Sequence, residues 1–374
     1  MAELDESATA GVVVVGAGPC GLAAAIATRN VGHPTIVLER SSVVSGLATY
    51  PTYMTFFSTA AKLAIGGIPF VVAGEKPSRR DALAYYRAVV EHFDLHVRQY
   101  ETVVKIGIGS GEWGVGGGGW EKWSRVGGAK SEGGSGTPDA GGGSRLAPRF
   151  VVHSVSRAGE NRKTGASAVI VATGYFGAPN QLGVPGESLP HVSHLYREGH
   201  EAFRQDVVVV GGGNSAVDAA LDLNRCGARV TLVHFGPTFD KNIKPWVLPD
   251  MSGRLSDGSI AAKWNSRVRA ITPSEVVVDT ADGEARLPAA HVYLMLGYLP
   301  EVGLLRDLGV PIDSRTGIPA HDAGSMETPI PGVFIAGVIA SGFDANKTFI
   351  ENGRFHGELI AKKLGRGEAV VGRR

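Results

Sequence analysis

The sequence of 374 residues has little cysteine: Cys20 and Cys226 are the two, and no C-x-x-C pair is present. This usage excludes a disulfide-stapled scaffold and a cysteine-based zinc site. No apolar run is long enough to cross a bilayer, and the acidic start "MAELDESATA" lacks the apolar stretch of a secretion signal. We therefore expect a cytoplasmic protein without a metal site and without a membrane anchor.

Neither sign of charge dominates the chain. Lys and Arg number 37 against 36 Asp and Glu, which gives a formal net charge of +1 and no basic field that would attract nucleic acid. Hydrophobic residues make up 43% and charged residues 20%, as in ordinary globular proteins. The length predicts more than one domain.

A glycine loop stands near the start of the chain, in "GVVVVGAGPCGLAAAIATRN". Four valines predict a buried strand, the glycines follow at once, and a run suited to a helix comes next. A second strand, in "PTIVLER", ends at Glu39. This order is typical of a loop that binds a nucleotide pyrophosphate, with an acidic residue for the ribose. The candidate residues are Gly16, Gly18, Pro19, Gly21, Glu39 and Arg40.

The same pattern recurs far downstream. Four valines at 207–210 precede "GGGNSA", a helix-compatible stretch, and the strand "RVTLVH". The spacing from Gly211 to His234 equals the spacing from Gly16 to Glu39. Two copies of one long pattern predict two dinucleotide-binding units. The candidate residues of the second unit are Gly211, Gly213, Asn214, Ser215, Ala216, His234 and Lys241.

The remaining segments predict an α/β fold in which the second unit is inserted into the first. We expect the first domain over 1–200, the inserted domain over 201–297 and the return to the first domain over 298–374. The stretch 110–146 is rich in glycine and predicts a flexible surface insertion, with an aromatic lid as the alternative. Further glycine turns after buried strands add Thr173, Gly174 and Gly337 to the candidate site.

These features resemble the flavoproteins that have two dinucleotide-binding domains of Rossmann type. Within them, the chain is similar to the bacillithiol disulfide reductase family (YpdA-type), through "GPCGLAAA", "YPTYMTFFST", "KLAIGGIPF", "KPSRRDALAYYR", "IKPWVLPD" and "FIENGRFHG". The resemblance covers nearly the whole chain outside the glycine-rich insertion. It implies FAD in the first domain, a nicotinamide nucleotide in the second, and a dimer or tetramer.

The resemblance also implies roles for C-terminal residues. The segment after Gly337 would follow the ribityl chain of FAD, and a helix beginning near Lys347 and Thr348 would point at the isoalloxazine. One departure is that Val338 stands where many relatives of the superfamily carry an aspartate for the ribityl hydroxyls.

The nucleotide preference of the second unit depends on the end of its second strand. A carboxylate there would repel a 2′-phosphate, but the residue is His234, and Lys241 and Lys244 follow it. This pattern favours NADPH. The alternative is that His234 only caps the strand and that the lysines are solvated.

Cys20 lies at the predicted start of a helix, where the helix dipole lowers the pKa of a thiol. The sequence therefore leaves two roles open: a redox-active thiol that attacks a disulfide, and a small residue that packs in the loop. Cys226 falls at a helix end that disfavours a thiolate, so we expect it to be structural.

The aromatic stretch "YPTYMTFFSTAAKL" follows the first unit. Tyr53, Phe56 and Phe57 are candidates to wall the flavin, with Ser58 and Thr59 as hydrogen-bonding neighbours. Packing in the core explains the aromatic residues as well.

We predict an oxidoreductase that uses FAD and NADPH to reduce a low-molecular-weight disulfide, which by resemblance is bacillithiol disulfide. Cys20 is its candidate catalytic residue. Two alternative functions, the rivals of this one, also fit the sequence. One is a flavin-dependent monooxygenase, and the other is a flavoprotein that passes electrons to a protein partner.

Overall fold

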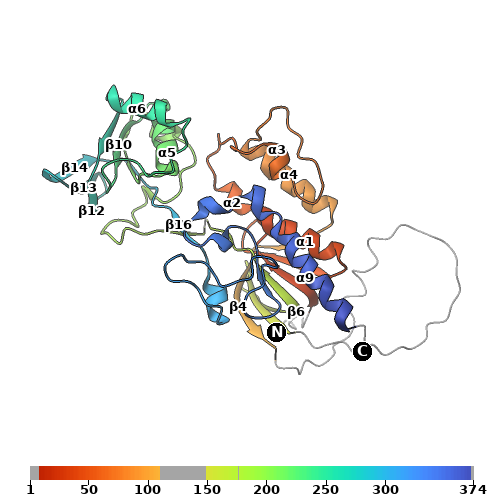
Figure 1. Ribbon diagram of the computed structural model, residues 1–374. Coiled ribbons are helices and arrows are strands. Elements are labelled where there is room, and N and C mark those ends of the chain that lie inside the picture. The colour runs from red at the N-terminus through yellow and green to blue at the C-terminus, as the bar shows by residue number, and fades with distance from the viewer. Residues whose placement is uncertain (1–7, 110–148, 176, 372–374) are drawn as a thin grey trace, which may run out of the picture.

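The computed structural model describes residues 8–109, 149–175 and 177–371. The chain forms two α/β units joined by a narrow two-stranded ribbon (Figure 1). The predicted insertion at 110–146 lies outside the described residues.

The first unit is built on a sheet of seven strands, and β6 holds it together. The order is β3-β2-β1-β6-β5-β4, and β17 also pairs with β6. The first half of β6 pairs antiparallel with β5, while its last residues, Val169 to Val171, pair parallel with β17. The strands of this sheet are β1 (Ala8–Val15), β2 (Thr35–Glu39), β3 (His96–Gln99), β4 (Glu101–Ile108), β5 (Phe150–Ser156), β6 (Asn161–Val171) and β17 (Val333–Ile335).

The long helices α1 and α9 of the first unit pack directly on each other (Figure 1). Gly357 makes this approach possible, because a Cβ there would lie 2.6 Å from the Cα of Ala24. The helices of the first unit are α1 (Pro19–Asn30), α2 (Ser45–Ala48), α3 (Ala60–Leu63), α4 (Arg79–His92), α7 (Gly303–Asp307), α8 (Ile350–Gly353) and α9 (His356–Val371), with 3₁₀ turns η2 (Gly337–Ser341) and η3 (Ala345–Lys347).

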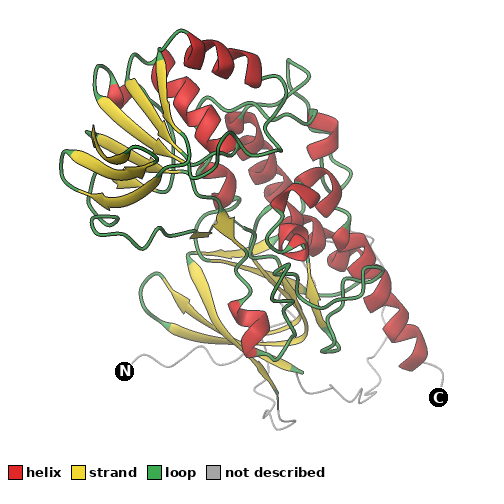
Figure 2. Ribbon diagram, turned by 60° about the vertical axis from the view of Figure 1, so that its left-hand side comes forward, coloured by secondary structure: helices red, strands yellow, loops and turns green. Residues whose placement is uncertain are grey.

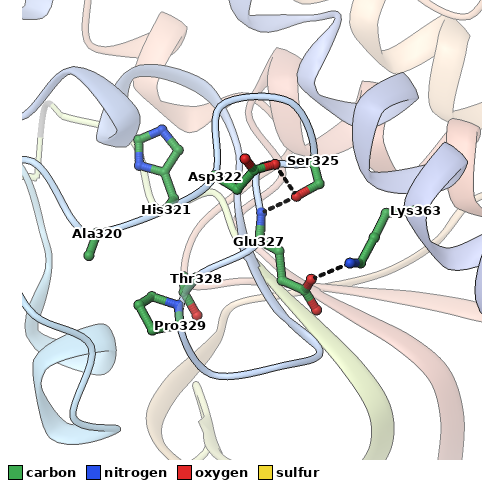
Figure 3. A pocket seen from close by; sticks show the side chains of 8 residues that line it. All are labelled: Ala320, His321, Asp322, Ser325, Glu327, Thr328, Pro329 and Lys363. Carbon is green, nitrogen blue, oxygen red and sulfur yellow. Dashed lines mark hydrogen bonds and ion pairs between the residues drawn. The ribbon is translucent and has the colours of Figure 1, made fainter.

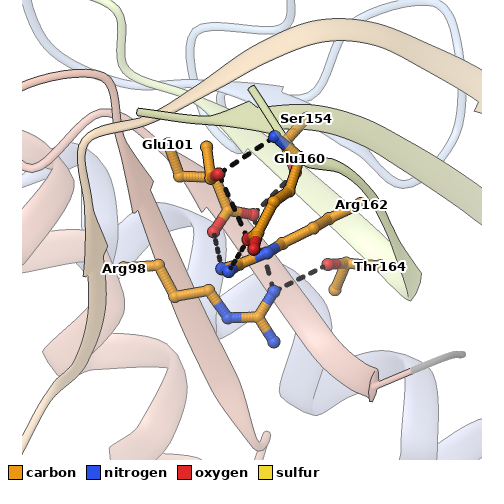
Figure 4. A network of polar contacts seen from close by, with 7 residues as sticks. Arg98, Glu101, Ser154, Glu160, Arg162 and Thr164 are labelled. Atoms are coloured by element: carbon orange, nitrogen blue, oxygen red, sulfur yellow. Dashed lines mark hydrogen bonds and ion pairs between the residues drawn. The ribbon is translucent and has the colours of Figure 1, made fainter. Parts of the chain in front are cut away.

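A buried carboxylate ties the far end of this sheet together (Figure 4). Glu101 is 1% exposed, accepts a 2.6 Å hydrogen bond from the Ser154 hydroxyl, and pairs with Arg162 at 3.1 Å. Arg98 lies 3.5 Å from the same carboxylate. Because a buried charge must be paired, this network fixes the register of β4, β5 and β6 at the end away from the glycine loop.

The second unit has a parallel sheet in the order β11-β10-β9-β15-β8 and a separate antiparallel sheet, β12-β13-β14. Apolar residues bury both faces of the parallel sheet, so its strands read as continuous hydrophobic runs. Figure 2 shows the strands of each unit as a separate group. The elements are β8 (Val192–Ser193), η1 (His200–Ala202), β9 (Asp206–Val210), α5 (Asn214–Arg225), β10 (Arg229–Val233), α6 (Leu248–Ser256), β11 (Ile260–Lys263), β12 (Arg267–Ile271), β13 (Glu275–Thr280), β14 (Gly283–Pro288) and β15 (His291–Leu294).

The ribbon between the units consists of β7 (Ala178–Pro179) and β16 (Tyr298–Leu299). Residues that follow β7 pack on the core of the second unit, among them Leu182, Val184 and Leu189. We therefore propose the first domain boundary at this ribbon, before the expected position at residue 200. The second crossing is at β16, and we propose the second boundary there, next to the predicted position at residues 297 and 298.

The predicted fold class, two dinucleotide-binding units with one inserted into the other, is confirmed. Among the residues that the structure describes, no helix is both long and apolar enough to span a membrane.

Candidate functional site

The first glycine loop is shaped by close contacts of its own backbone. A Cβ at Gly16 would lie 2.4 Å from the Ala172 carbonyl oxygen, and the φ of Gly16 is +108°. A Cβ at Gly21 would lie 2.0 Å from the carbonyl oxygen of Gly16. These two glycines are therefore needed for the loop to fold between β1 and β6.

Gly18 differs from its neighbours in the loop. A Cβ there would meet nothing within 4 Å, so the protein itself does not require glycine at this position. Gly18 is the N-cap of α1, and Pro19 is its first residue. The free backbone N–H groups of a helix start bind anions, and a glycine with open space before it lets a pyrophosphate approach. The loop thus fits a dinucleotide.

Glu39 lies inside the site and is held there by the loop. Its side chain is 6% exposed; Oε2 accepts from the Ala17 N–H at 2.8 Å, and Oε1 accepts from Ser41 N–H and the Ser45 hydroxyl at 2.9 and 3.1 Å. An ionised carboxylate oxygen accepts two hydrogen bonds, so Oε2 retains capacity for a ribose hydroxyl. The predicted role of Glu39 fits this geometry.

Arg40 and Thr173 share a partner in the segment after β16. The Arg40 guanidinium donates to both carboxylate oxygens of Glu301 at 2.7 and 2.9 Å, and the Thr173 hydroxyl donates to the Glu301 carbonyl at 3.1 Å. The two residues therefore brace the link between the units. Gly174 has a φ of +79° and open space at its Cβ position, as a backbone that faces a ligand requires.

The C-terminal segment closes over the start of α1. Gly337 has a φ of +81° and donates its N–H to Nδ1 of His356 at 3.1 Å. Burial, and secondarily the charge of His321, lowers the pKa of His356 to about 4, so its imidazole is neutral and can accept this bond. His356 is a contact that the sequence patterns did not reveal, because the pair is 19 residues apart and no motif marks it.

The helix that we expected to begin near Lys347 and Thr348 begins later in the chain, at Ile350. Lys347 ends the turn η3, and Thr348 contacts the Ser341 hydroxyl before α8 begins at Ile350. The helix α8 has four residues, which is too short to direct a strong dipole at a flavin. The side chain of Asn352, which bonds Phe349 N–H and the Lys347 carbonyl, favours the turn over a longer helix.

Cys20 is the second residue of α1, and its side chain packs against the C-terminal segment. A Cβ at Gly337 would be 3.2 Å from its Sγ, and a Cβ at Gly353 would be 3.0 Å away, so the thiol packs closely against both glycines. Burial raises the pKa of the Cys20 thiol to about 12. The resting thiol is therefore neutral, because desolvation raises its pKa by more than the start of a helix lowers it.

The side chains of the aromatic stretch at residues 50–63 lie in several different environments. Phe56 is 5% exposed and belongs to the core, whereas Phe57 is 40% exposed and makes an edge contact with Phe349. Tyr53 reaches the other unit, where its hydroxyl donates to the Asp218 carbonyl at 3.4 Å. Ser58 bonds Glu351 at 2.9 Å. For Phe56, core packing is the role that the structure supports.

The second glycine loop, like the first, is shaped by close contacts of its own backbone. Gly211 has a φ of +142°, and a Cβ there would lie 2.4 Å from the Met295 carbonyl oxygen. Gly213 is the N-cap of α5, and Ala216 is fully buried behind it. Ser215 is exposed at the helix start, where a hydroxyl can donate to a phosphate.

His234 has a different position from the one expected. Its side chain is 3% exposed and lies beneath the loop: a Cβ at Gly212 would be 2.3 Å from its Cε1. Asp240 is 3.7 Å from its Nε2. The ring therefore supports the loop from below and does not face an incoming 2′-phosphate.

The lysines that follow also have separate roles. Lys244 pairs with Asp218 at 2.8 Å, and its N–H bonds the Asn214 side chain. Asn214 also donates to the Asn242 carbonyl, so it anchors this segment to the start of α5. Lys241 is exposed and follows directly after Asp240.

Two open pockets lie elsewhere. One of about 490 Å³ is lined by residues including His321, Asp322, Glu327 and Lys363, with Lys363 paired to Glu327 at 3.1 Å (Figure 3). The other, of about 480 Å³, lies near Glu187 and His194. Within the described ranges no cluster of three or more His, Cys, Asp or Glu residues could hold a metal.

Comparison with known proteins agrees with this geometry. The model of the pyridine nucleotide-disulphide oxidoreductase family matches residues 13–115 and 150–337, which include both glycine loops. The chain belongs to this family. It is therefore an oxidoreductase, and membership implies FAD and NADPH as its cofactors.

Full-length relatives narrow the place of the chain within the family. It is 39% identical to bacilliredoxin reductase Bdr of Bacillus subtilis over 95% of this chain and 98% of that protein. The solved bacillithiol disulfide reductase Bdr (YpdA) of Bacillus cereus matches with a TM-score of 0.84, 38% identity and coverage of 96% and 100%. The Staphylococcus aureus Bdr matches with a TM-score of 0.81, 34% identity and coverage of 96% and 99%. The predicted resemblance to the YpdA-type family is confirmed.

Proposed function

We propose that this protein is an FAD-containing, NADPH-dependent reductase of a low-molecular-weight disulfide, and that the disulfide is bacillithiol disulfide. The observation that carries the proposal is the pair of glycine loops, each at the end of a buried parallel strand, in a chain that matches solved bacillithiol disulfide reductases over 96% of its length. The balanced reaction converts NADPH, a proton and one disulfide into NADP⁺ and two thiols.

The residues of the first unit fit FAD. We propose that Gly16, Gly18 and Gly21 form the cradle of its pyrophosphate and that Glu39 accepts from its ribose. FAD, when bound, accepts a hydride from the nicotinamide and supplies two electrons to the disulfide. The second loop, with Gly213 and Ser215 at the start of α5, would hold the pyrophosphate of NADPH.

The cysteines restrict how electrons reach the substrate. Cys20 and Cys226 are both unpaired and lie in different units, so the described chain contains no dithiol pair that could store two electrons. Cys226 ends α5, and its pKa is raised, chiefly by burial. The disulfide therefore takes its electrons from the flavin directly or through the single thiol of Cys20, which we keep as the candidate catalytic residue in its neutral resting form.

The stoichiometry of turnover tests the proposal. Purified protein loaded with FAD is mixed with NADPH and bacillithiol disulfide, with no other protein present, and thiols are counted against NADPH consumed. We expect two thiols for each NADPH. Oxygen uptake coupled to NADPH oxidation, or turnover that needs an added redox protein, would replace the proposal by one of the two rivals. A homo-oligomer remains a prediction.

A further inference from the structure

The residues that the sequence indicated do not by themselves account for recognition of the 2′-phosphate of NADPH. In a dinucleotide-binding unit the adenosine half lies at the carboxyl end of the second strand, which here is β10. His234 at this end is buried beneath Gly212. Lys244 is paired with Asp218. Of the residues predicted to meet this phosphate, only Lys241 is exposed, and it follows directly after the carboxylate of Asp240, so further positive charge must come from another segment.

The neighbouring strand brings its end to the same place. β11 is parallel to β10, with Lys263 in register with Val233. The chain then wraps around the end of β10: His234 N–H donates to the Lys263 carbonyl, and Ser266 N–H donates to the His234 carbonyl, both at 2.9 Å. The segment 263–267 therefore borders the region that an adenosine would occupy.

Two cations and an aromatic ring are exposed at this border. The Arg267 guanidinium carbon lies 5.2 Å from the centre of the Phe235 ring, and Phe235 is 61% exposed. Lys263 is exposed as well. In the part of the chain that the structure describes, neither Lys263 nor Arg267 has an ion-pair partner, whereas Arg269, two residues further along β12, is paired with Glu284.

We propose that Arg267 and Lys263 bind the adenosine 2′-phosphate and that Phe235 packs against the adenine. A guanidinium stacked on an aromatic ring keeps its N–H groups directed outward, which suits two-point recognition of a phosphate. Aromatic rings offer a flat apolar surface to a base. This inference rests on the proposed use of NADPH and names the residues that distinguish it from NADH.

Calorimetric binding of adenosine 2′,5′-bisphosphate and of adenosine 5′-monophosphate to the FAD-loaded protein tests the proposal. We expect Arg267→Met and Lys263→Met each to weaken the bisphosphate by about tenfold to a hundredfold, and the monophosphate by less than about twofold. Phe235→Ala should weaken both ligands, and the bisphosphate more, because Arg267 also loses the ring on which it is stacked. Arg269→Gln is the matched control and should bind both as the wild type does.

Two results would overturn the proposal: equal affinity of the wild type for both ligands, or an Arg267→Met protein that binds the bisphosphate as tightly as the wild type. Melting temperatures of the variants identify any that have lost the fold, and Lys263→Gln then replaces a misfolded variant. Because binding is measured without turnover, a protein that passes this test and yet reduces no disulfide would refute the proposed substrate and keep the inference.

Discussion

Two glycines of the first loop serve different purposes: one is needed for folding, and the other is needed for cofactor binding. Substitutions at the two positions should therefore have different effects. A Cβ at Gly18 meets nothing within 4 Å, and the φ of Gly18, −69°, suits any residue. A Cβ at Gly21 would stand 2.0 Å from a backbone oxygen. Gly18→Ala should therefore leave the apoprotein folded, whereas Gly21→Ala should damage the loop itself.

The magnitudes follow from these contacts. For Gly18→Ala we expect a change of less than about 1 kcal/mol in apoprotein stability, since only the N-cap preference changes. Crowding of a pyrophosphate by the new methyl group costs about 1–3 kcal/mol, which weakens FAD by about fivefold to a hundredfold. For Gly21→Ala we expect a loss of about 3 kcal/mol or more in the apoprotein, because backbone cannot move aside as a flexible side chain can.

The assay combines thermal melting of the apoprotein with titration of FAD by the quenching of its fluorescence. Gly253→Ala, in α6 of the other unit with open space at its Cβ, is the control for an added methyl group. FAD affinity in Gly18→Ala equal to that of the wild type would show that the pyrophosphate does not lie against this glycine, and would refute the assignment of the loop.

Three further predictions concern single residues. The raised pKa of Cys20, about 12, leaves about one thiolate in 10⁵ at pH 7. The rate of its alkylation by iodoacetamide should therefore rise about tenfold for each pH unit up to about pH 11. A midpoint of the rate profile at or below about pH 8 would contradict this prediction. His356 is neutral in the folded state, because its pKa is lowered to about 4. Its contribution to the free energy of unfolding, at most about 3 kcal/mol, should therefore be lost as the pH falls from about 6.5 to 4. Melting curves of His356→Gln should lack this part of the acid dependence, and an unchanged dependence would count against the prediction. Gly186→Ala places a Cβ 1.8 Å from the Ile271 carbonyl oxygen and should destabilise the second unit by several kcal/mol in urea unfolding, while Gly183→Ala, with a φ of +71° and open space, should cost only about 1 kcal/mol; equal costs would refute the contact.

Local patterns predicted the parts of the site that depend on local structure. A buried strand, a glycine turn and a helix follow one another within a short stretch, so the sequence predicts the two loops and the place of Glu39. The fold class followed because the same pattern occurs twice with equal spacing.

The sequence could not predict contacts between distant segments. The state of Cys20 depends on Gly337 and Gly353, which return to α1 from the other end of the chain. The position of His234 depends on the backbone of Gly212 above it, and its residue type alone suggested a contact with solvent and phosphate. These outcomes are set by burial, which a helix start or a strand end does not reveal.

The most direct test of the central claim is an anaerobic stopped-flow experiment on the FAD-loaded protein. The flavin is reduced with one equivalent of NADPH and then mixed with bacillithiol disulfide, while its absorbance is followed in the wild type and in Cys20→Ala. We expect the disulfide alone to reoxidise the flavin of the wild type, and the variant shows whether the thiol takes part. A reduced flavin that persists in the presence of the disulfide would contradict the account.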